Sequence, residues 1–309
     1  MKTGIVVVGS LNADLVARVA RFPRPGETVP GTDLAIYPGG KGANQACAAA
    51  RLGGSVVMVG RVGDDANGRL LCDSLDSAGV DTGAVVKDSS APTGTALITI
   101  DEAGQNQIVV VPGANGVVSA ADVESQRETI ENAGFVLLQL ELPLPAVEAA
   151  ARLARRAGAV VILDPAPIRD AAWRLLPLAD YVTPNERELD HLARLGGLAA
   201  PEVEGDLARR LLAAGAKSVV SKLGAGGARL VDTTGEISWP AVEVDAVDTT
   251  AAGDVWNGAF ATALATGMEV DAAGRFANAA AALSVTRPGA QPSMPTGTEL
   301  ALFMKGRSS

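Results

Sequence analysis

The chain has 309 residues, of which 48% are hydrophobic and 20% are charged, and its formal net charge is -9. This length and apolar content suffice for one large core, whereas the acidic balance disfavours a nucleic-acid binder, which normally presents a basic face. The chain opens on a short β-type run, Ile5–Val8, rather than a secretory signal or a membrane span. We therefore expect a cytoplasmic protein without a nucleic-acid or membrane partner.

Cysteine and histidine are scarce, which excludes several kinds of site. Cys47 and Cys72 have neither a disulfide framework nor a metal-ligand spacing, so we expect two buried, reduced thiols. A site with several histidine ligands is impossible because His191 is the single histidine. It lies in a polar helical pattern and is expected to be a solvated helix residue.

Short β-branched runs alternate with longer runs rich in Ala and Leu along most of the chain. Continuous apolar strands between helices are typical of a parallel sheet that helices cover on both faces. The predicted fold class is α/β: a three-layer, doubly wound, mostly parallel sheet that binds ligands beyond the carboxyl ends of its strands. The predicted strands are Ile5–Val8, Ser55–Val59, Phe135–Leu140, Val160–Leu163, Tyr181–Thr183 and Ser218–Ser221. The predicted helices are Lys41–Leu52, Gly68–Ser77, Ala120–Asn132, Pro145–Arg156, Glu186–Leu195, Glu202–Ala214, Asp254–Thr266 and Asp271–Val285.

Two segments, approximately residues 15–36 and 93–111, interrupt this alternation. The first shows alternating residues without a helical period, and the second is typical of a hairpin with a turn at Gly104. We expect both to form a small β-sheet within one domain of residues 1–309. Its role is that of a lid that excludes water, an edge used for subunit contact, or both.

The run Asp248-Thr-Thr-Ala-Ala-Gly-Asp254 leads into an apolar helical pattern rich in small residues. A helix N-terminus offers free N–H groups and partial positive charge, and small residues let a phosphate approach them closely. A carboxylate there, Asp254, can accept the proton of a substrate hydroxyl that attacks the phosphate. The alternative is an ordinary first-turn acid that only stabilises the helix.

Two glycine-rich turns are weaker signals. Gly39-Gly-Lys-Gly42 opens a predicted helix and presents Lys41 and Asn44 as donors, which suits a polyol or a phosphate. Leu223-Gly-Ala-Gly-Gly227 follows a predicted strand, which suits a nucleotide phosphate or ribose. Each is also compatible with a purely structural turn.

Polar side chains follow several predicted strands at their carboxyl ends. Asn12 and Asp14 follow the first strand, Glu141 follows Phe135–Leu140, and Asn185 follows Tyr181–Thr183. Carboxylates and amides in these places can bind vicinal hydroxyls, although each is also compatible with ordinary turn chemistry. Their shared position predicts a small-molecule cleft.

The chain resembles the ribokinase-like (PfkB) sugar kinase family. The resemblance rests on Gly39-Gly-Lys-Gly-Ala-Asn-Gln45, Thr183-Pro-Asn-Glu186 and Asp248–Asp254, which occur in this order at wide separation. Further matches are Gly9–Asp14, Pro23–Thr28, Asp164–Pro167 and Val285–Ser293, so the resemblance covers about residues 4 to 304. It implies an ATP-dependent kinase that converts D-ribose to D-ribose 5-phosphate, with Asp254 as general base.

The resemblance also implies residue roles. The anion hole would be the backbone of Ala251, Ala252, Gly253 and Asp254. The sugar would be held by Asn12, Asp14, Gly39, Gly40, Lys41, Asn44, Glu141 and Asp254. The ATP site would be lined by Asn185, Lys222, Leu223, Gly224, Ala225, Gly226, Gly227, Gly253 and Asn278. Mg²⁺ would travel with the nucleotide phosphates, with Glu188 as a support through water.

A K⁺ or other monovalent cation beside the anion hole is implied as well, and so is a homodimer formed through the β lid. The implied cation ligands are Asp248, Thr250, Ser284, Arg287, Gly289 and Ser293, some through main-chain oxygens. Three places depart from the commoner family pattern: Lys222 replaces a frequent Thr, Asp164 a frequent Asn, and Val255-Trp256 a frequent Thr/Ala-Phe pair.

Two other functions remain open. One is a sibling kinase for 2-deoxyribose, another furanose or a nucleoside. A nucleoside requires an apolar base pocket, whereas only 3% of the residues are aromatic. The other is a non-catalytic sugar-binding protein on the same fold, against which the intact run Asp248–Asp254 argues.

Overall fold

A computed structural model describes residues 2–195 and 207–307. Its centre is a 10-stranded sheet with the order β14-β13-β12-β11-β10-β9-β1-β4-β5, and β6 pairs with β4 beside this path. Neighbouring strands are parallel except at β12–β13 and β13–β14, which are antiparallel. The strands are β1 Ile5–Val8, β4 Val56–Gly63, β5 Val80–Asp81, β6 Val85–Asp88, β9 Phe135–Leu138, β10 Val160–Leu163, β11 Tyr181–Val182, β12 Ser218–Lys222, β13 Ala228–Asp232 and β14 Glu236–Trp239. The predicted mostly parallel sheet is confirmed.

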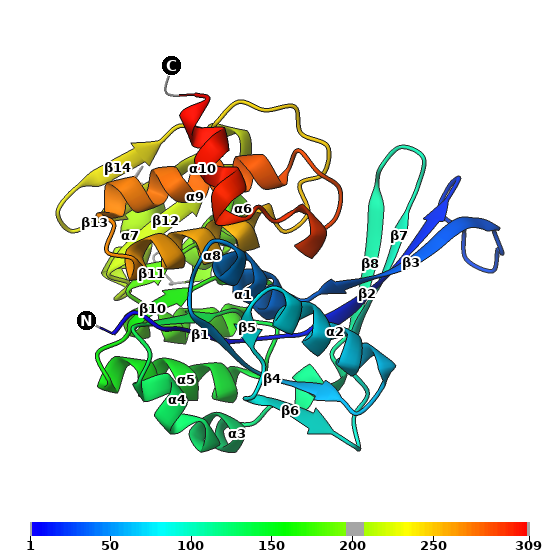
Figure 1. Ribbon diagram of the computed structural model, residues 1–309, viewed down its shortest axis with the longest axis horizontal. Helices are drawn as coiled ribbons and strands as arrows, with labels where there is room; N and C mark the ends of the chain where they lie inside the picture. The colour runs from blue at the N-terminus through cyan, green and yellow to red at the C-terminus, as the bar shows by residue number, and fades with distance from the viewer. Residues whose placement is uncertain (1, 196–206, 308–309) are drawn as a thin grey trace.

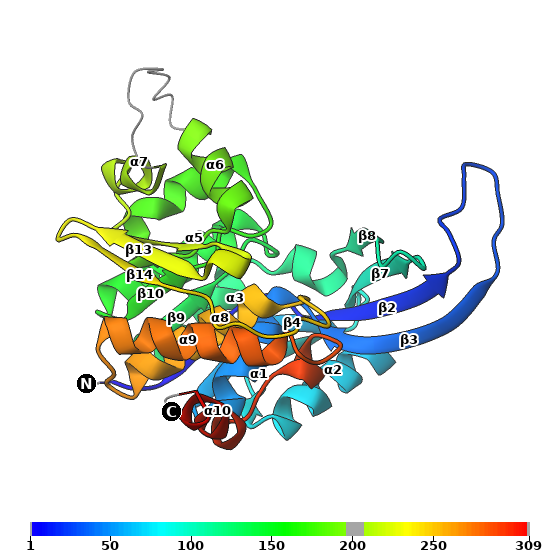
Figure 2. The ribbon, with the colours of Figure 1, turned by 90° about the horizontal axis from the view of Figure 1, so that it is seen from above.

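Helices cover both faces of this sheet, as Figures 1 and 2 show. One face carries α1 Lys41–Arg51, α2 Ala66–Ser77, α8 Ala252–Ala265, α9 Val270–Ser284 and α10 Gly297–Lys305. The other carries α3 Ala120–Ser125, α4 Arg127–Glu131, α5 Leu144–Arg156, α6 Glu186–Leu195 and α7 Leu207–Ala213. Short 3₁₀ turns are η1 Gly113–Val117, η2 Asp170–Leu178, η3 Gly224–Gly226 and η4 Gln291–Ser293.

Alternation along each strand divides the interior into two cores. In β1, Ile5 and Val7 pack with α1 and α8, whereas Val6 and Val8 pack with α5 on the opposite face. Successive strand side chains point to opposite faces, so a strand covered on both sides must be apolar throughout. This burial explains why the strands are continuous β-branched runs in the sequence.

A second, 4-stranded sheet has the order β3-β2-β7-β8. Its strands are β2 Asn12–Val19, β3 Gly31–Gly39, β7 Gly94–Ile100 and β8 Asn106–Val111. It extends sideways from the body as a separate arm, which we call the lid sheet (Figure 1). The predicted hairpin is β7–β8, while β2 and β3 extend beyond the predicted segment 15–36 at both ends.

Some element boundaries differ from the prediction. The helix expected over Ala120–Asn132 is broken at Gln126, where the Ser125 hydroxyl donates to the Asp122 carbonyl and competes with the helix backbone. The helix expected over Glu202–Ala214 is α7 from Leu207 onward, and residues 202–206 lie outside the described part of the chain. The antiparallel pair β13–β14 and the helix α10 were not predicted.

Several exclusions made from composition can be compared with the structure. Cys47 and Cys72 are buried free thiols, as expected. His191 lies in α6 with its side chain 37% exposed, and its Nε2 contacts the exposed Asp170 Oδ1 at 2.9 Å. Across residues 2–195 and 207–307, none of the helices combines the length and apolar character needed to cross a membrane.

Candidate active site

The carboxyl edge of the parallel strands gathers the polar side chains that follow them. Lys222 ends β12, Asn185 follows β11, Asp164 follows β10, and Glu141 follows β9. These four strands and β1 are neighbours in the sheet and run parallel, so their carboxyl ends lie along one edge. At the position predicted for the cleft, the structure therefore has a row of polar groups along this edge.

The helix α8 begins at this edge with a strained backbone. Ala251, its N-cap residue, has φ 60, the left-handed region that non-glycine residues rarely occupy, and it is the one such residue in the described chain. The N–H groups of the following turn have no intrahelical acceptors and carry partial positive charge. Asp254 lies in this first turn and is 5% exposed. The run therefore presents both anion-binding N–H groups and a buried carboxylate.

Close packing of α1 against α8 positions that carboxylate. A Cβ placed on Gly258 would stand 2.6 Å from the Gln45 carbonyl oxygen, so the two helices approach closely at a residue without a side chain. This approach places two amides of α1 against Asp254. Asn44 Nδ2 donates to Asp254 Oδ2 at 3.1 Å, and Gln45 Nε2 donates to Asp254 Oδ1 at 3.1 Å.

The protonation of Asp254 reflects its burial. Its pKa is raised from 3.8 to about 6; desolvation is the largest cause, the charge of Lys41 lowers the pKa, and the charge of Asp164 raises it. The amides of Gln45 and Asn44 also lower this pKa because they stabilise the anion. A carboxylate with a pKa near 6 is mostly ionised at neutral pH and is a stronger base than an exposed Asp.

Glu141 and a backbone turn at Gly40 flank Asp254 on the side of the lid sheet. Glu141 Oε2 accepts from the Ser10 hydroxyl and from the Lys41 backbone N–H, which anchors it at the start of α1. Gly40 has φ 90, and a Cβ there would stand 2.7 Å from the Asn12 backbone nitrogen, so this turn requires glycine.

Asp14 and Asn12 come from β2 of the lid sheet. A Cβ on Gly39 would fall 2.1 Å from Asp14 Oδ2, so the glycine leaves room for that carboxylate. Burial and the charges of Glu141 and Asp254 raise the pKa of Asp14 to about 7. Asn12 Oδ1 accepts from Asn115 Nδ2 at 2.8 Å, so a residue of η1 holds it in place.

Lys41 balances this group of acids. Burial opposes its charge, but Asp254, Asp164, Glu141 and Glu188 together raise the pKa of its ammonium. It therefore stays cationic among carboxylates that would otherwise repel one another. This arrangement accommodates a neutral polyol beside a cation that can approach a phosphate.

On the other side of Asp254, Lys222 forms an ion pair with Asp164 at 3.1 Å between Nζ and Oδ1. A Cβ on Gly253 would stand 3.4 Å from Lys222 Nζ, so this ammonium lies beside the first turn of α8. The predicted glycine turn Leu223–Gly227 contains η3 and joins β12 to β13 as a hairpin turn, exposed at Gly224, Ala225 and Gly226.

Asn185 and Glu188 hold each other at the start of α6. Glu188 accepts from the Asn185 backbone N–H at 2.8 Å and from Asn185 Nδ2 at 2.9 Å, and the Glu188 N–H donates back to Asn185 Oδ1 at 2.9 Å. Burial raises the pKa of Glu188, as does Asp164, while Lys222 lowers it. Asn185 also forms an isolated parallel bridge with Lys222, so both lie at the same place on the edge.

Asn278, predicted as an ATP-site residue, uses its side-chain amide for hydrogen bonds within the protein. Its Oδ1 accepts from Trp256 Nε1 at 2.8 Å, and its Nδ2 donates to the carbonyls of Trp239 at 2.9 Å and Pro240 at 3.1 Å. The side chain joins α8, α9 and the end of β14. It supports that wall of the site.

The residues predicted for a monovalent cation come together from two segments. Asp248 accepts from the Thr250 N–H at 2.9 Å and from the Gly289 N–H at 2.8 Å. Ser284 and Ser293 are buried, and each donates to a nearby carbonyl, while the Arg287 guanidinium pairs with Glu299. A loop rich in oxygen donors thus lies directly before the anion-binding turn.

Residue patterns did not identify four of the buried groups. Gln45 and Asp164 contact the site directly, and Gln139 and Asn115 support it. One signal was present: Gln139 lies within the predicted apolar strand Phe135–Leu140, where a polar residue needs a partner. The pairing of Gln45 with Asp164 depends on tertiary packing and has no local signal.

Comparisons with known proteins agree with this geometry. The family model described as pfkB family carbohydrate kinase matches residues 2–297. A ribokinase of Bacillus subtilis is 42% identical over 96% of this chain and 97% of its own. The crystal structure of a ribokinase from Thermotoga maritima is 40% identical, with a TM-score of 0.91 over 98% of this chain and 99% of that one.

A further solved structure, Arabidopsis thaliana ribokinase complexed with ribose and ATP, is 36% identical, with a TM-score of 0.88 over 99% of both chains. The family match spans the strand-end row, the lid sheet and the first turn of α8. The chain belongs to the pfkB family of carbohydrate kinases.

Proposed function

We propose that this protein transfers the γ-phosphoryl group of ATP to the 5-hydroxyl of D-ribose, giving D-ribose 5-phosphate and ADP. The observation that carries the proposal is the buried Asp254 carboxylate in the first turn of α8, held by Asn44 and Gln45. A non-catalytic sugar binder has no need for a carboxylate at a site that also binds anions. The similarity to ribokinases supports ribose as the sugar.

In the proposed mechanism Asp254 accepts the proton of the 5-hydroxyl as that oxygen attacks the γ-phosphorus. The new bond joins the sugar oxygen to phosphorus, and the bond from phosphorus to the β,γ-bridging oxygen breaks, leaving its electron pair on ADP. The N–H groups of the first turn of α8, at Ala252, Gly253 and Asp254, stabilise the charge on the transferred group. The left-handed Ala251 aims this turn.

The sugar hydroxyls are bound by the acids and amides on the lid side of Asp254. Asp14, Asn12 and Glu141 accept or donate to vicinal hydroxyls, and the Gly39–Gly40 turn gives the ring access to the backbone. Leaving a buried carboxylate without its hydroxyl partner is unfavourable. This set therefore favours ribose over sugars that lack one of these hydroxyls.

ATP is placed along Asn185, Lys222 and the exposed turn Leu223–Gly227, with Asn278 supporting the wall behind it. Mg²⁺ bound by the phosphates would neutralise part of their charge. Glu188 fits a role through a metal-bound water, because both of its oxygens already accept hydrogen bonds from Asn185 and keep lone pairs free. Dependence on ATP and the free thiols are consistent with a cytoplasmic protein.

A monovalent cation is part of the same proposal. Asp248 and Ser293, with main-chain oxygens near Thr250, Ser284, Arg287 and Gly289, would hold K⁺ beside the loop that leads into α8. Oxygen donors with one carboxylate suit a weakly charged, hard cation. We expect turnover in K⁺ to exceed turnover in Na⁺ or Tris buffer, and equal rates would remove this part of the proposal.

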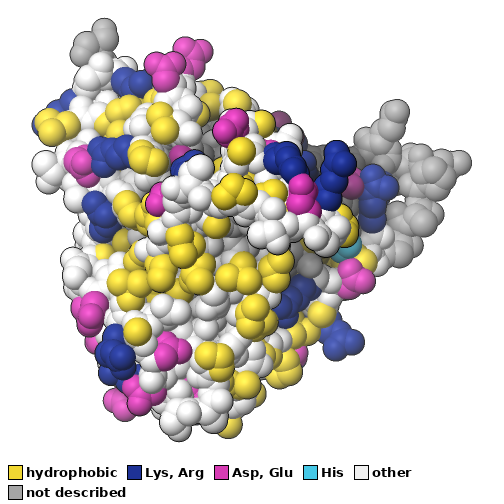
Figure 3. Space-filling model, turned by 90° about the vertical axis from the view of Figure 1, so that its right-hand side faces the viewer, with side chains coloured by type: hydrophobic (Ala, Val, Ile, Leu, Met, Phe, Trp, Pro, Cys, Tyr) yellow, Lys and Arg dark blue, Asp and Glu magenta, His cyan; other side chains and the backbone are white. Residues whose placement is uncertain are grey.

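The lid sheet is proposed both to close over the sugar and to join two subunits. Its strands expose Leu34, Ile36, Leu97, Val109 and Val111, although such side chains are normally buried in a monomer. Figure 3, viewed from the lid side, shows hydrophobic side chains gathered on that face of the molecule. We propose that a second copy of the chain covers these exposed side chains of the lid sheet.

A coupled ADP-release assay with Mg-ATP and K⁺ tests the function against ribose, 2-deoxyribose, fructose, adenosine and pseudouridine. We expect a clear preference for ribose. Activity only on another compound would keep the kinase and change the sugar. No activity on any of the five compounds would favour the alternative of a non-catalytic sugar-binding protein.

The variant Asp254→Asn tests the base. We expect turnover to fall by about 10²- to 10⁴-fold, as removal of a general base does, while ribose still binds. Glu128→Gln is the matched control because Glu128 is the first-turn acid of α4 and is exposed. Unchanged turnover in Asp254→Asn would remove Asp254 as the base.

A further inference from the structure

We propose that Asp164 is a positioning residue for phosphoryl transfer, which links the ammonium of Lys222 to the Asp254 carboxylate through the side-chain amide of Gln45. This inference rests on the proposed role of Asp254 as base. It gives a role to Asp164 and Gln45, two buried polar residues that neither the sugar site nor the ATP site had included.

A single chain of contacts connects the four side chains. Lys222 Nζ donates to Asp164 Oδ1 at 3.1 Å, Gln45 Nε2 donates to Asp164 Oδ2 at 2.9 Å, and the same Nε2 donates to Asp254 Oδ1 at 3.1 Å. Gln45 is 1% exposed and Asp164 is 2% exposed. Hydrogen bonds in such a buried place are strong, and unpaired groups there are costly.

The orientation of the Gln45 amide is determined by its surroundings. Its Oε1 accepts from Gln139 Nε2 at 2.7 Å, so its NH₂ group faces the two carboxylates. The reversed amide would point a carbonyl oxygen at both Asp164 and Asp254, which is electrostatically unfavourable. The two hydrogens of one amide thus bridge two acids that would otherwise repel each other.

The position of Lys222 gives this chain of contacts its link to the phosphate. Its Nζ lies 3.4 Å from the point where a Cβ on Gly253 would stand, so it faces the anion-binding turn of α8. Asp164 holds the ammonium at that place before ATP arrives. When the γ-phosphoryl group enters, Lys222 is already oriented toward its charge, and the reorganisation needed for catalysis is reduced.

Charged groups from several elements face this chain of contacts. Lys41 of α1, Asp14 of β2 and Asp164 lie around Asp254. Glu188 of α6 interacts with Asp164, Lys222 and Lys41. Among these, Asp164 raises the pKa of Asp254, which desolvation has already raised, and Lys41 and the Gln45 amide lower it.

The direction of each change follows from these charges. Asp254 accepts a proton only when it is ionised, so activity falls as pH drops through its pKa, near 6. Removing the charge of Asp164 lowers that pKa and moves the acidic limb of kcat/KM to lower pH. Removing the Gln45 amide with Gln45→Met raises the pKa and moves the limb to higher pH.

The experiment measures pH profiles for Asp164→Asn, Lys222→Met, the double variant and Gln45→Met. We expect each single variant at the ion pair to lower kcat by about 10-fold with little change in the KM for ribose. The double variant should lose far less than the product of the two single losses, because both partners of one contact are removed together. Opposite shifts of the acidic limb in Asp164→Asn and Gln45→Met are the readout that a merely structural role would not produce.

The matched control is the ion pair Lys217–Asp180, which lies at the amino ends of β11 and β12 instead of their carboxyl ends. Asp180→Asn and Lys217→Met should leave the pH limb and the kcat unchanged. If Asp164→Asn does not fold, Gln45→Met alone still tests the bridge to Asp254.

Two results would overturn the inference: an acidic limb that stays in place in both Asp164→Asn and Gln45→Met, or single losses that simply multiply in the double variant. A carboxyl ¹³C NMR titration of Asp254, assigned by its loss in Asp254→Asn, reads the same shifts without substrate. The titration also tests the two proposals separately. A protein that phosphorylates none of the sugars would disprove the proposed function, whereas the titration would still show whether Asp164 and Gln45 change the pKa of Asp254.

Discussion

At the scale of single residues, the site concentrates acidic groups that would each be more stable in water. Asp14, Glu141 and Asp254 lie near enough to interact, and burial is the largest cause of the raised pKa values of Asp14 and Asp254. Grouped, desolvated acids are typical of functional sites, where stability is given up for binding and catalysis. The positive charge of Lys41 and the hydrogen bonds from the side-chain amides of α1 offset the repulsion among these acids.

The variant Asp14→Asn tests whether burial of this acid lowers the stability of the fold. The folded pKa of Asp14, about 7, lies above its ordinary value of 3.8, so the folded state binds the proton more tightly than the unfolded state does. The resulting penalty on folding is absent below about pH 4, grows as pH rises, and is complete above about pH 7. Asp14→Asn should therefore raise Tm by roughly 2–4 °C at pH 8, and by less at pH 5, while weakening ribose binding.

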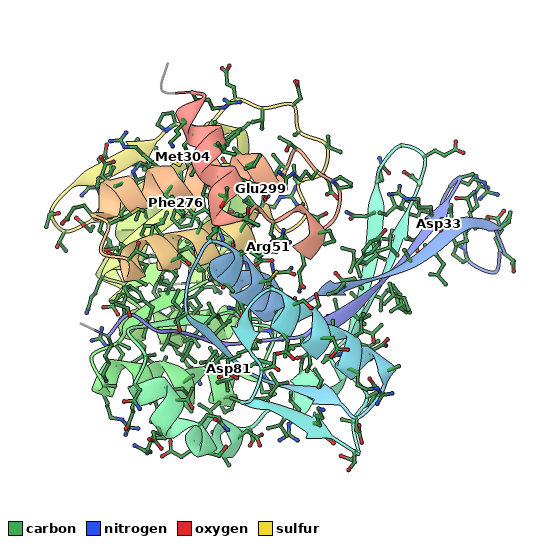
Figure 4. The ribbon with its side chains drawn as sticks, viewed as in Figure 1. Asp33, Arg51, Asp81, Phe276, Glu299 and Met304 are labelled. Atoms are coloured by element: carbon green, nitrogen blue, oxygen red, sulfur yellow. The ribbon has the colours of Figure 1, made fainter. Side chains whose placement is uncertain are left out.

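Thermal unfolding at the two pH values, at one protein concentration, measures this difference. Asp33→Asn is the control because Asp33 is an exposed acid of the same lid sheet, labelled on its strand in Figure 4. A Tm change of equal size at pH 5 and pH 8 would show that burial of the Asp14 charge is not the cause.

At the scale of elements, apolar patterning predicted most of the body. The six predicted strands are present because each is buried on both faces, and the first turn of α8 was placed correctly from the run Asp248–Asp254. The pair β13–β14 was missed, since its residues do not form a long apolar run. At the break between α3 and α4 the Ser125 hydroxyl donates to the Asp122 carbonyl, a bond that periodicity does not reveal.

Prediction of the site was limited in a different way. Residues at strand ends and in glycine turns carry a local signal, and the prediction of Asn12, Asp14, Glu141, Asn185 and Asp254 as site residues rests on it. Gln45 and Asp164 were not assigned to the site, because they lie 119 positions apart in sequence and meet only after α1 has packed beside the carboxyl end of β10. A buried polar residue signals that a partner exists without naming it.

The packing of α1 on α8 leads to a prediction for Gly258→Ala. The new Cβ would fall 2.6 Å from the Gln45 carbonyl oxygen and 2.9 Å from the Ala49 nitrogen, both backbone atoms that cannot move independently. Overpacking of this kind costs about 1–3 kcal/mol. Because Asn44 and Gln45 hold Asp254, we expect kcat to fall together with stability.

Gly297→Ala is the matched control, a helical glycine of α10 whose Cβ would meet nothing closer than 3.6 Å. There the substitution should be neutral or slightly stabilising, since Ala favours helix more than Gly does. Denaturant unfolding and steady-state kinetics on both variants decide the matter. Full activity and unchanged stability in Gly258→Ala would contradict the close approach of the two helices.

At the scale of the whole molecule, the two faces of the lid sheet carry different side chains and are proposed to have different tasks. In its register Leu15 lies opposite Ile36 and Leu97, and Leu97 lies opposite Val109, so these side chains share one face. Asp14 directly precedes Leu15 in β2 and therefore points to the other face, that of the proposed sugar site. Figures 1 and 4 show the sheet extending away from the body, with side chains projecting from its strands.

The face opposite Asp14 leads to a prediction about assembly. Leu34 lies on it, two residues from Ile36, and is 67% exposed. If a second copy covers this face, Leu34→Lys buries an unpaired charge at the contact and should convert a dimer to a monomer. Leu302→Lys on α10 is the matched control, because Leu302 is 66% exposed but far from the lid sheet, and should leave the dimer intact. Sedimentation equilibrium at several concentrations measures both variants. A wild-type chain that stays monomeric, or a Leu34→Lys variant that stays dimeric, would contradict a dimer formed through this face.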